Sequence, residues 1–179
     1  YGGSCLPKDM KALINFAKAS GINPTLLNAV EEVNTKQLEQ IILMIKQKLG
    51  NLASKKITIL GTAFKPNTDD IRDSIAIELI KKLLNKKAKI IIHDPKAMKN
   101  TQRIFKEKIN YAKTIEDALA KSQCVIIMTQ WKQYEKLNNN QFKYMTRKFV
   151  IDCRRMLAKK QLDVDYYAIG LGKQNWNIL

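Results

Sequence analysis

The chain has 179 residues, of which 45% are hydrophobic, enough for one ordinary domain with an additional segment or for two small units. The longest apolar run, 41–45, is too short to span a bilayer, and no basic segment followed by an apolar one opens the chain. Three widely spaced cysteines and a single histidine exclude a disulfide framework and a zinc site. We therefore expect a cytoplasmic protein without a membrane anchor, a signal peptide or a metal.

The net charge of +16 raises the possibility of nucleic-acid binding. The lysines that cause it are spread along the whole chain, and no zinc finger, aromatic RNP-like strand or Gly-Arg tract accompanies them. Abundant Asn and Ile beside the Lys indicate a compositional bias. A basic nucleic-acid-binding module is therefore the least favoured alternative for this chain.

The chain opens with the motif YGGSCLPKD. Pro7 suits the first position of a helix that we expect to reach Ala19 and to end at Gly21. Cys5 would then lie at the amino end of the helix, where unpaired N–H groups favour a thiolate, and Asp9 would lie in the first turn. Taken singly, an Asp there complements the helix dipole and a lone Cys is most often a buried apolar residue. Together with two preceding glycines, they indicate a nucleophile site.

Residues 23–49 carry apolar side chains at helical spacing, which predicts one long helix. Asn23 is a candidate cap, and Pro24 suits the first helical position. Such a helix is ~40 Å long at 1.5 Å per residue, longer than a small domain needs. We therefore expect a helical central segment (1–50) that bridges to a second domain (51–179) and packs against another copy of the chain. An ordinary core helix is the alternative.

After this helix, apolar runs alternate with helical patterns. This alternation predicts a parallel sheet covered on both faces, an α/β fold of the Rossmann-like kind. Ligands of such sheets bind at the carboxyl ends of the strands. The expected strands are 56–60, 89–93, 124–129, 149–152 and a short 166–170, and the expected helices are 74–84 and 114–121.

The loop GTAFKPNTDDIRDS (61–74) follows the first of these strands and is not the G-x-G-x-x-G dinucleotide fingerprint. Its Lys65 and Arg72 suit a phosphate ligand that is held by side-chain charge. The alternative is a solvated polar loop in which Asp73 or Ser74 caps the next helix.

Two further segments follow expected strands. Arg154 and Arg155 come directly after a buried strand, a position that suits an anion; surface charge is the alternative. Asp94 and Pro95 follow the strand 89–93 and predict a turn.

The opening motif and the loop 61–74 resemble the UDP-glucose 6-dehydrogenases, which belong to the wider NAD-dependent UDP-sugar dehydrogenases. The resemblance covers the whole chain, and Gly-Gly-Ser-Cys followed by Lys-Asp favours the glucose branch over the N-acetylmannosamine branch. It implies a long bridging helix followed by a Rossmann-like, parallel-sheet UDP-binding domain. It also implies UDP-glucose and UDP-glucuronate as ligands, NAD as cofactor and a homodimer built on the long helix.

The resemblance also assigns roles to residues. The sugar C6 alcohol is oxidised to the carboxylate with two NAD; Cys5 attacks the aldehyde, and the resulting thiohemiacetal becomes a thioester that water hydrolyses. Only such an adduct presents the aldehyde carbon as an sp³ hydride donor. Asp9 would position or activate the water. The implied substrate-binding residues are Gly2, Gly3, Phe64, Lys65, Arg154 and Arg155, and the implied NAD-side residue is Arg72.

One part of the family pattern is missing: these 179 residues contain no Gly-rich NAD loop. We therefore expect a carboxy-terminal portion of such an enzyme that is inactive without an amino-terminal NAD domain. The alternative is a non-catalytic relic that keeps nucleotide-sugar binding and dimerisation.

Overall fold

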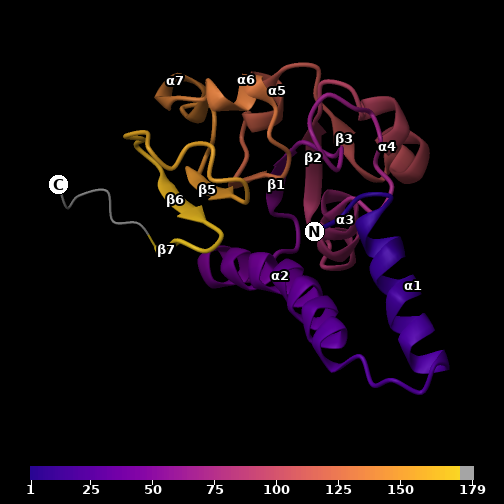
Figure 1. Cartoon of the computed structure of the whole chain (residues 1–179). Coiled ribbons are helices and arrows are strands. Elements are labelled where there is room, and N and C mark those ends of the chain that lie inside the picture. Colours follow the sequence, from indigo (N-terminus) through magenta and orange to yellow (C-terminus); the bar gives the residue numbers. More distant parts are fainter. Residues whose placement is uncertain (174–179) are drawn as a thin grey trace.

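The computed structural model describes residues 1–173 and shows two helices followed by a sheet with helices on both faces (Figure 1). The predicted second domain, 51–179, extends to residues 174–179, which lie outside the described part. The helices are α1 (Leu6–Ala19), α2 (Thr25–Leu49), α3 (Ile75–Asn85), α4 (Met98–Phe105), the 3₁₀ helix η1 (Lys106–Lys108), α5 (Ile115–Leu119), α6 (Lys132–Glu135) and α7 (Asn139–Phe142). The strands are β1 (Lys56–Leu60), β2 (Lys89–His93), β3 (Asn110–Tyr111), β4 (Cys124–Ile127), β5 (Phe149–Asp152), β6 (Asp165–Ala168) and β7 (Gly172–Lys173).

The strands form one sheet in the order β3-β2-β1-β4-β5-β6-β7. All neighbouring pairs are parallel except β6 and β7, which are antiparallel. Because β1 and β4 are parallel, the loops after these two strands leave the same edge of the sheet. The strand order reverses between them, and ligands of such sheets commonly bind at this point. The predicted α/β fold with a parallel sheet is confirmed.

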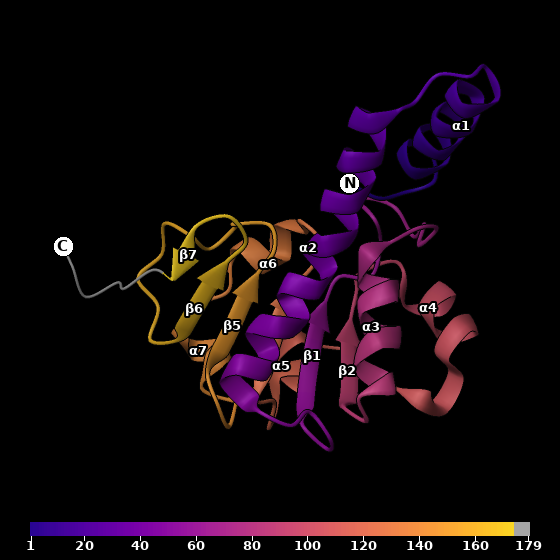
Figure 2. The same cartoon turned by 90° about the horizontal axis from the view of Figure 1, so that it is seen from below.

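Alternate residues of the strands point into two separate cores. Ile57 and Ile59 of β1 face α2 and α3, whereas Leu60 faces the side covered by α5, α6 and α7 (Figure 2). All three side chains are fully buried. Because successive strand residues point to opposite faces, a sheet covered on both sides requires the unbroken apolar runs seen in the sequence.

Helix α2 is divided into two halves by its surroundings. Its carboxyl half packs on the sheet and carries the helix's buried side chains, whereas its amino half and α1 extend past the carboxyl edge of the sheet (Figure 2). Leu26 is 75% exposed there, and Phe16 of α1 is 71% exposed. The predicted single long helix is confirmed. Its buried residues are Leu38, Ile41, Ile42, Ile45 and Leu49.

The helix starts differ from the predicted ones. Helix α2 begins at Thr25, so Pro24 occupies the cap position, and the Asn23 side chain makes no capping bond; the backbone oxygen of Asn23 instead accepts the Thr25 N–H at 3.0 Å. Helix α1 begins at Leu6, which makes Pro7 its second residue. Proline tolerates all of these positions, since its missing N–H has no partner in the first turn.

Candidate active site

The cysteine motif packs directly against the loop that follows β1. The Gly3 N–H donates to the backbone oxygen of Asp73 at 3.1 Å. Gly3 has a φ of 91°, and a Cβ there would lie 2.5 Å from the Phe64 ring. A Cβ on Gly2 would lie 2.9 Å from the Asp73 oxygen. The two glycines therefore permit a backbone-to-ring contact that joins two segments distant in the sequence.

Helix α2 holds the start of the same motif. The Asn34 side-chain amide donates to the backbone oxygen of Tyr1 at 2.9 Å, and the Tyr1 hydroxyl donates to the Glu31 carboxylate. Loss of surrounding water, followed by the effect of Glu31, raises the pKa of Tyr1 to about 12. The motif is thus anchored between α2 and the loop after β1.

Cys5 occupies the cap position of α1, and its side chain is exposed. Its sulfur lies 3.8 Å from the Ser4 hydroxyl oxygen. Asp9 lies one turn further along, and its N–H donates to the Cys5 backbone oxygen at 2.9 Å. The Asp9 carboxylate pairs with Lys8 at 3.1 Å, and no hydrogen bond between it and the Cys5 thiol occurs among the described residues. Asp9 is therefore near the thiol without contacting it.

Arg72 lies on the cysteine side of the loop. Its Nη2 is 2.7 Å and its Nε 3.0 Å from the Asp70 carboxylate. This hydrogen-bonded pair is the main cause that raises the pKa of Arg72 and lowers the pKa of Asp70. A coulombic interaction with Cys5 is the smallest cause of the raised pKa of Arg72, so the guanidinium and the Cys5 side chain lie within electrostatic range of one another.

Lys65 is exposed and has its ammonium nitrogen 5.2 Å from the centre of the Phe64 ring. No ion pair engages it within residues 1–173, although its charge contributes to the lowered pKa of Asp70. A cation of this kind can accept an anionic ligand without breaking an existing bond.

Arg154 and Arg155 lie at the same edge of the sheet, after β5. The Arg154 Nε donates to the backbone oxygen of Met128 at 2.6 Å, and its N–H donates to the Asp152 carboxylate at 2.9 Å. Arg155 is exposed, with a φ of 56°. The structure thus brings the cysteine motif together with Phe64 and Arg72. Arg154 and Arg155 lie at the same edge of the sheet but are not hydrogen-bonded to Lys65 in the described part of the chain.

Asp94, which the sequence places at the carboxyl end of a strand and in a predicted turn, has a structural role that the sequence analysis did not assign. This side chain is 3% exposed and ties the loop after β1 to the start of α4 and to the loop after β4. The available signal was an Asp that directly follows a buried strand, where carboxylates often organise neighbouring loops. The carboxylate accepts five N–H groups, from the backbone of Thr62, Ala63, Lys96 and Ala97 and from the indole of Trp131.

Ser74, a predicted cap of α3, has a different role. It occupies the cap position, but its hydroxyl donates to the backbone oxygen of Thr62 at 2.7 Å and makes no capping bond. Asp73 has a φ of 47°, and its backbone oxygen accepts the Gly3 N–H. Both residues therefore serve the loop and the cysteine motif rather than the helix end.

Two hollows flank this loop at the carboxyl edge, with volumes of about 630 Å³ and 480 Å³. Both are lined by Asn67 and Pro95. The larger also contacts Lys96 and Lys99, and the smaller contacts Trp131. A ligand at this edge would therefore meet both apolar and cationic side chains.

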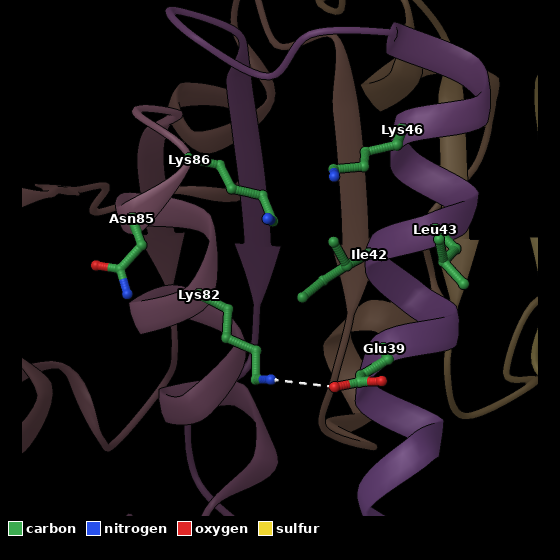
Figure 3. Close-up of a pocket in the computed structure, with 7 residues that line it drawn as sticks. All are labelled: Glu39, Ile42, Leu43, Lys46, Lys82, Asn85 and Lys86. Atoms are coloured by element: carbon green, nitrogen blue, oxygen red, sulfur yellow. Dashed lines mark ion pairs between the residues drawn. The ribbon is translucent and has the colours of Figure 1, made fainter.

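A separate groove of about 310 Å³ lies between α2 and α3, away from the predicted residues (Figure 3). Ile42 forms part of its wall, and Lys46 and Lys86 extend into it from opposite sides. Lys82 pairs with Glu39 at 3.6 Å. The groove is thus strongly cationic.

Neither a metal-binding group of His, Cys, Asp and Glu nor a helix long and apolar enough to cross a membrane occurs among residues 1–173.

Comparison with known proteins identifies the family of the chain. Residues 58–159 match the family model of the UDP-glucose/GDP-mannose dehydrogenase family, UDP binding domain, and residues 1–36 match the central domain of the same family. The chain belongs to the UDP-glucose/GDP-mannose dehydrogenase family. The predicted resemblance is therefore confirmed at the level of the family.

Relatives within the family include UDP-glucose 6-dehydrogenases. The chain is 38% identical over 169 residues to AglM of Haloferax volcanii, covering 94% of this chain and 38% of that protein. It is 30% identical over 174 residues to TuaD of Bacillus subtilis, with 95% and 38% covered. The chain thus spans about two fifths of the length of these relatives. A solved UDP-glucose dehydrogenase from Pyrobaculum islandicum superposes with a TM-score of 0.84 at 33% identity, with 93% and 37% covered.

Proposed function

We propose that the chain is the carboxy-terminal part of an NAD-dependent UDP-glucose 6-dehydrogenase, which converts UDP-glucose to UDP-glucuronate. The observation that carries the proposal is the packing of Gly3 on Phe64, which sets the cysteine motif beside the cationic loop after β1. Residues 1–50 would form the central, dimerising segment and residues 51–179 the domain that binds the UDP-sugar.

In this proposal Cys5 is the nucleophile. Its thiolate sulfur bonds to the C6 aldehyde carbon, and the aldehyde oxygen takes up a proton to give a thiohemiacetal. The thiohemiacetal would then become a thioester by loss of a hydride from C6, for which NAD would be the acceptor, and of its hydroxyl proton to solvent. Attack of water on the thioester carbon would break the C–S bond, which releases the carboxylate and restores the thiol. The exposure of Cys5 permits this attack, and Asp9, one turn away, would orient the water.

NAD, when bound, would accept the hydride. Of the residues named here, only Arg72 would contact it. Arg72 is exposed, and two of its nitrogens are held by Asp70, so one nitrogen remains for a cofactor phosphate. The 179 residues contain no G-x-G-x-x-G loop, which commonly cradles the pyrophosphate. We infer that these residues by themselves do not turn over UDP-glucose.

The substrate phosphates would be bound by Lys65, with Arg154 and Arg155 at the same edge. Gly2, Gly3 and Phe64 would line the sugar pocket. Lys65 supports this assignment best, because it is exposed, beside Phe64 and free of an ion pair within the described residues.

Calorimetric titration of the chain with UDP-glucose tests this assignment. Wild type should bind, and Lys65→Ala should bind about tenfold more weakly or worse, because one charge-assisted hydrogen bond contributes roughly 1.5–3 kcal/mol. The matched control is Lys108→Ala, which removes an exposed lysine of η1 and should leave the affinity unchanged.

Equal weakening by the two variants would contradict the role of Lys65. Absence of wild-type binding would contradict the proposed function, and tight binding of nucleic acid in its place would support the nucleic-acid alternative.

Complementation distinguishes an enzyme portion from a non-catalytic relic. Addition in trans of the amino-terminal NAD domain of a related enzyme should restore UDP-glucose-dependent NADH formation. Cys5→Ser should abolish that NADH while UDP-glucose binding persists. NADH formation by Cys5→Ser equal to wild type would exclude the thiol mechanism, and no activity in any combination would favour the relic.

We also propose that a second copy of the chain covers α1 and the amino half of α2. Large apolar side chains are exposed along this arm, beyond the sheet core that buries the rest of α2. Isolated exposed apolar residues are ordinary, but a row of them on two adjacent helices is typical of an interface. The row comprises Leu13 and Phe16 of α1, Leu26, Val30 and Val33 of α2, and Ile22 in the connection between the two helices.

A further inference from the structure

We propose that the side chains of Ser74, Asp94 and Thr129 form a backbone clamp on residues 62–63, which positions Lys65 for the substrate. The role of Lys65 rests on the proposed function; the clamp itself does not. The clamp makes all three positioning residues.

One side of the clamp holds the N–H groups. The Asp94 Oδ2 accepts the N–H of Thr62 at 2.7 Å and the N–H of Ala63 at 3.1 Å. These residues follow the end of β1, where the sheet no longer provides backbone partners. A buried N–H group without a partner is costly, so the carboxylate takes over from the sheet.

The other side of the clamp holds the carbonyl groups. The Ser74 hydroxyl donates to the Thr62 oxygen at 2.7 Å, and the Thr129 hydroxyl donates to the Ala63 oxygen at 2.6 Å. Both hydroxyls are buried, with side chains 2% and 1% exposed. Every backbone polar group of residues 62–63 is therefore bonded to a side chain from another part of the fold.

The approach of Thr129 depends on a glycine. Gly61 has a φ of 92°, and a Cβ there would lie 2.4 Å from the Thr129 Cβ. Only a residue without a side chain allows the threonine to reach the carbonyl beyond it. Gly61 and Thr129 thus act as a pair. Gly61 follows the carboxyl end of β1, and Thr129 follows the carboxyl end of the neighbouring strand β4.

The clamped segment leads directly into the proposed site. Phe64 comes next, and its N–H donates to the Asp70 backbone oxygen at 3.1 Å. Its ring packs on Gly3, and Lys65 extends over that ring. Since Thr129 is buried and cannot touch a ligand in solvent, its effect on binding must pass through the backbone of residues 62–63.

A pair of threonine variants isolates this effect. Thr129→Val removes the clamp hydroxyl. Thr58→Val removes another fully buried hydroxyl, which donates to the Ala118 oxygen at the same 2.6 Å and lies within β1, away from the loop. Both variants should lower the thermal midpoint to a similar degree. Only Thr129→Val should weaken UDP-glucose binding, by roughly tenfold.

The double variant with Lys65→Ala gives a readout that a general stability defect would not move. If Thr129 acts by positioning Lys65, Thr129→Val should cause little further loss of affinity once Lys65 is absent. Equal losses from Thr129→Val in both backgrounds would overturn the positioning role, as would equal effects of Thr129→Val and Thr58→Val on binding.

Amide hydrogen exchange in the ligand-free chain tests the clamp without any substrate. Exchange at residues 62–65 should be faster in Thr129→Val than in wild type, and unchanged there in Thr58→Val. Ser74→Ala should reproduce the effect, and it replaces Thr129→Val if that variant does not fold. Unchanged exchange in both clamp variants would overturn the clamp. Failure of the wild-type chain to bind UDP-glucose would instead overturn the proposed function, and the exchange result would still decide whether the clamp exists.

Discussion

His93 is the one histidine of the chain, and it lies buried at the end of β2. The Tyr134 hydroxyl donates to the His93 backbone oxygen at 2.8 Å, so the phenol oxygen is left to accept from the Nδ1–H of the ring, 3.0 Å away. Burial lowers the pKa of His93, and the nearby charges of Asp94 and Glu116 offset this only in part. The folded protein therefore holds a neutral imidazole.

This burial links stability to pH. An unfolded histidine takes up a proton below pH ~6.5, and the folded one resists it until a lower pH. The free energy of unfolding contributed by His93 is thus present above about pH 6.5 and is lost as the pH falls toward the folded pKa. Proton NMR of the single histidine should report a pKa below 6.5.

His93→Asn is the control for this prediction, since its amide can still donate to Tyr134 while it does not titrate. Urea unfolding of wild type should lose more stability between about pH 7 and 5 than unfolding of the variant. Parallel pH curves for the two proteins would contradict the linkage.

At the scale of elements, α1 and the amino half of α2 form an arm that exposes large apolar side chains. The carboxyl half of α2 buries Ile45 completely, yet Leu26 in its amino half is 75% exposed. One helix with the same apolar stripe along its length thus has two environments. Burial of a side chain such as Leu or Phe contributes about 1.5–3 kcal/mol, which makes the exposed half a favourable interface.

Phe16→Asp and Leu26→Asp should therefore shift the chain from dimer to monomer in sedimentation equilibrium, because each places a charge in the proposed interface. Ile104→Asp is the matched control, since Ile104 is an exposed apolar residue on α4, outside the arm. A monomeric wild type, or an equal shift by all three variants, would contradict the proposed dimer.

The whole molecule carries a net charge of +16, an excess of one sign that makes its charges repel one another on average. The groove between α2 and α3 shows the effect locally, because Lys46 and Lys86 face it and have no acidic partner among the described residues (Figure 3). Excess charge of one sign destabilises a compact state, and salt screens it over a Debye length of about 10 Å at 0.1 M.

Raising the sodium chloride concentration from about 0.01 to 0.1 M should thus raise the thermal midpoint. The double variant Lys46→Gln/Lys86→Gln should show a smaller rise than Lys108→Gln/Lys113→Gln, which removes the same charge from exposed positions elsewhere. A midpoint that falls with salt, or equal rises in the two double variants, would count against the repulsion.

Much of the fold follows from short-range patterns. Strands β1, β2 and β5 have the predicted bounds, and α2 and α3 lie within two residues of theirs, since long apolar periodicities leave little choice of structure. Helix α4 and several short elements were not predicted, because two to eight residues hold too few periods of a hydrophobic pattern to be recognised. The antiparallel β7 was likewise not predicted. The missed short elements are β3, η1, α6 and α7.

The sequence by itself determined the family resemblance, the parallel sheet and the residues at the ends of its strands, because these depend on composition and on neighbours in the chain. Only the tertiary structure decided which of those residues meet: that Gly3 packs on Phe64, that Arg72 is held by Asp70 near Cys5, and that Asp94 and Thr129 bond the same loop. Such contacts join residues far apart in the chain, and the spacing of residues along one strand or helix carries no information about which loop folds against it.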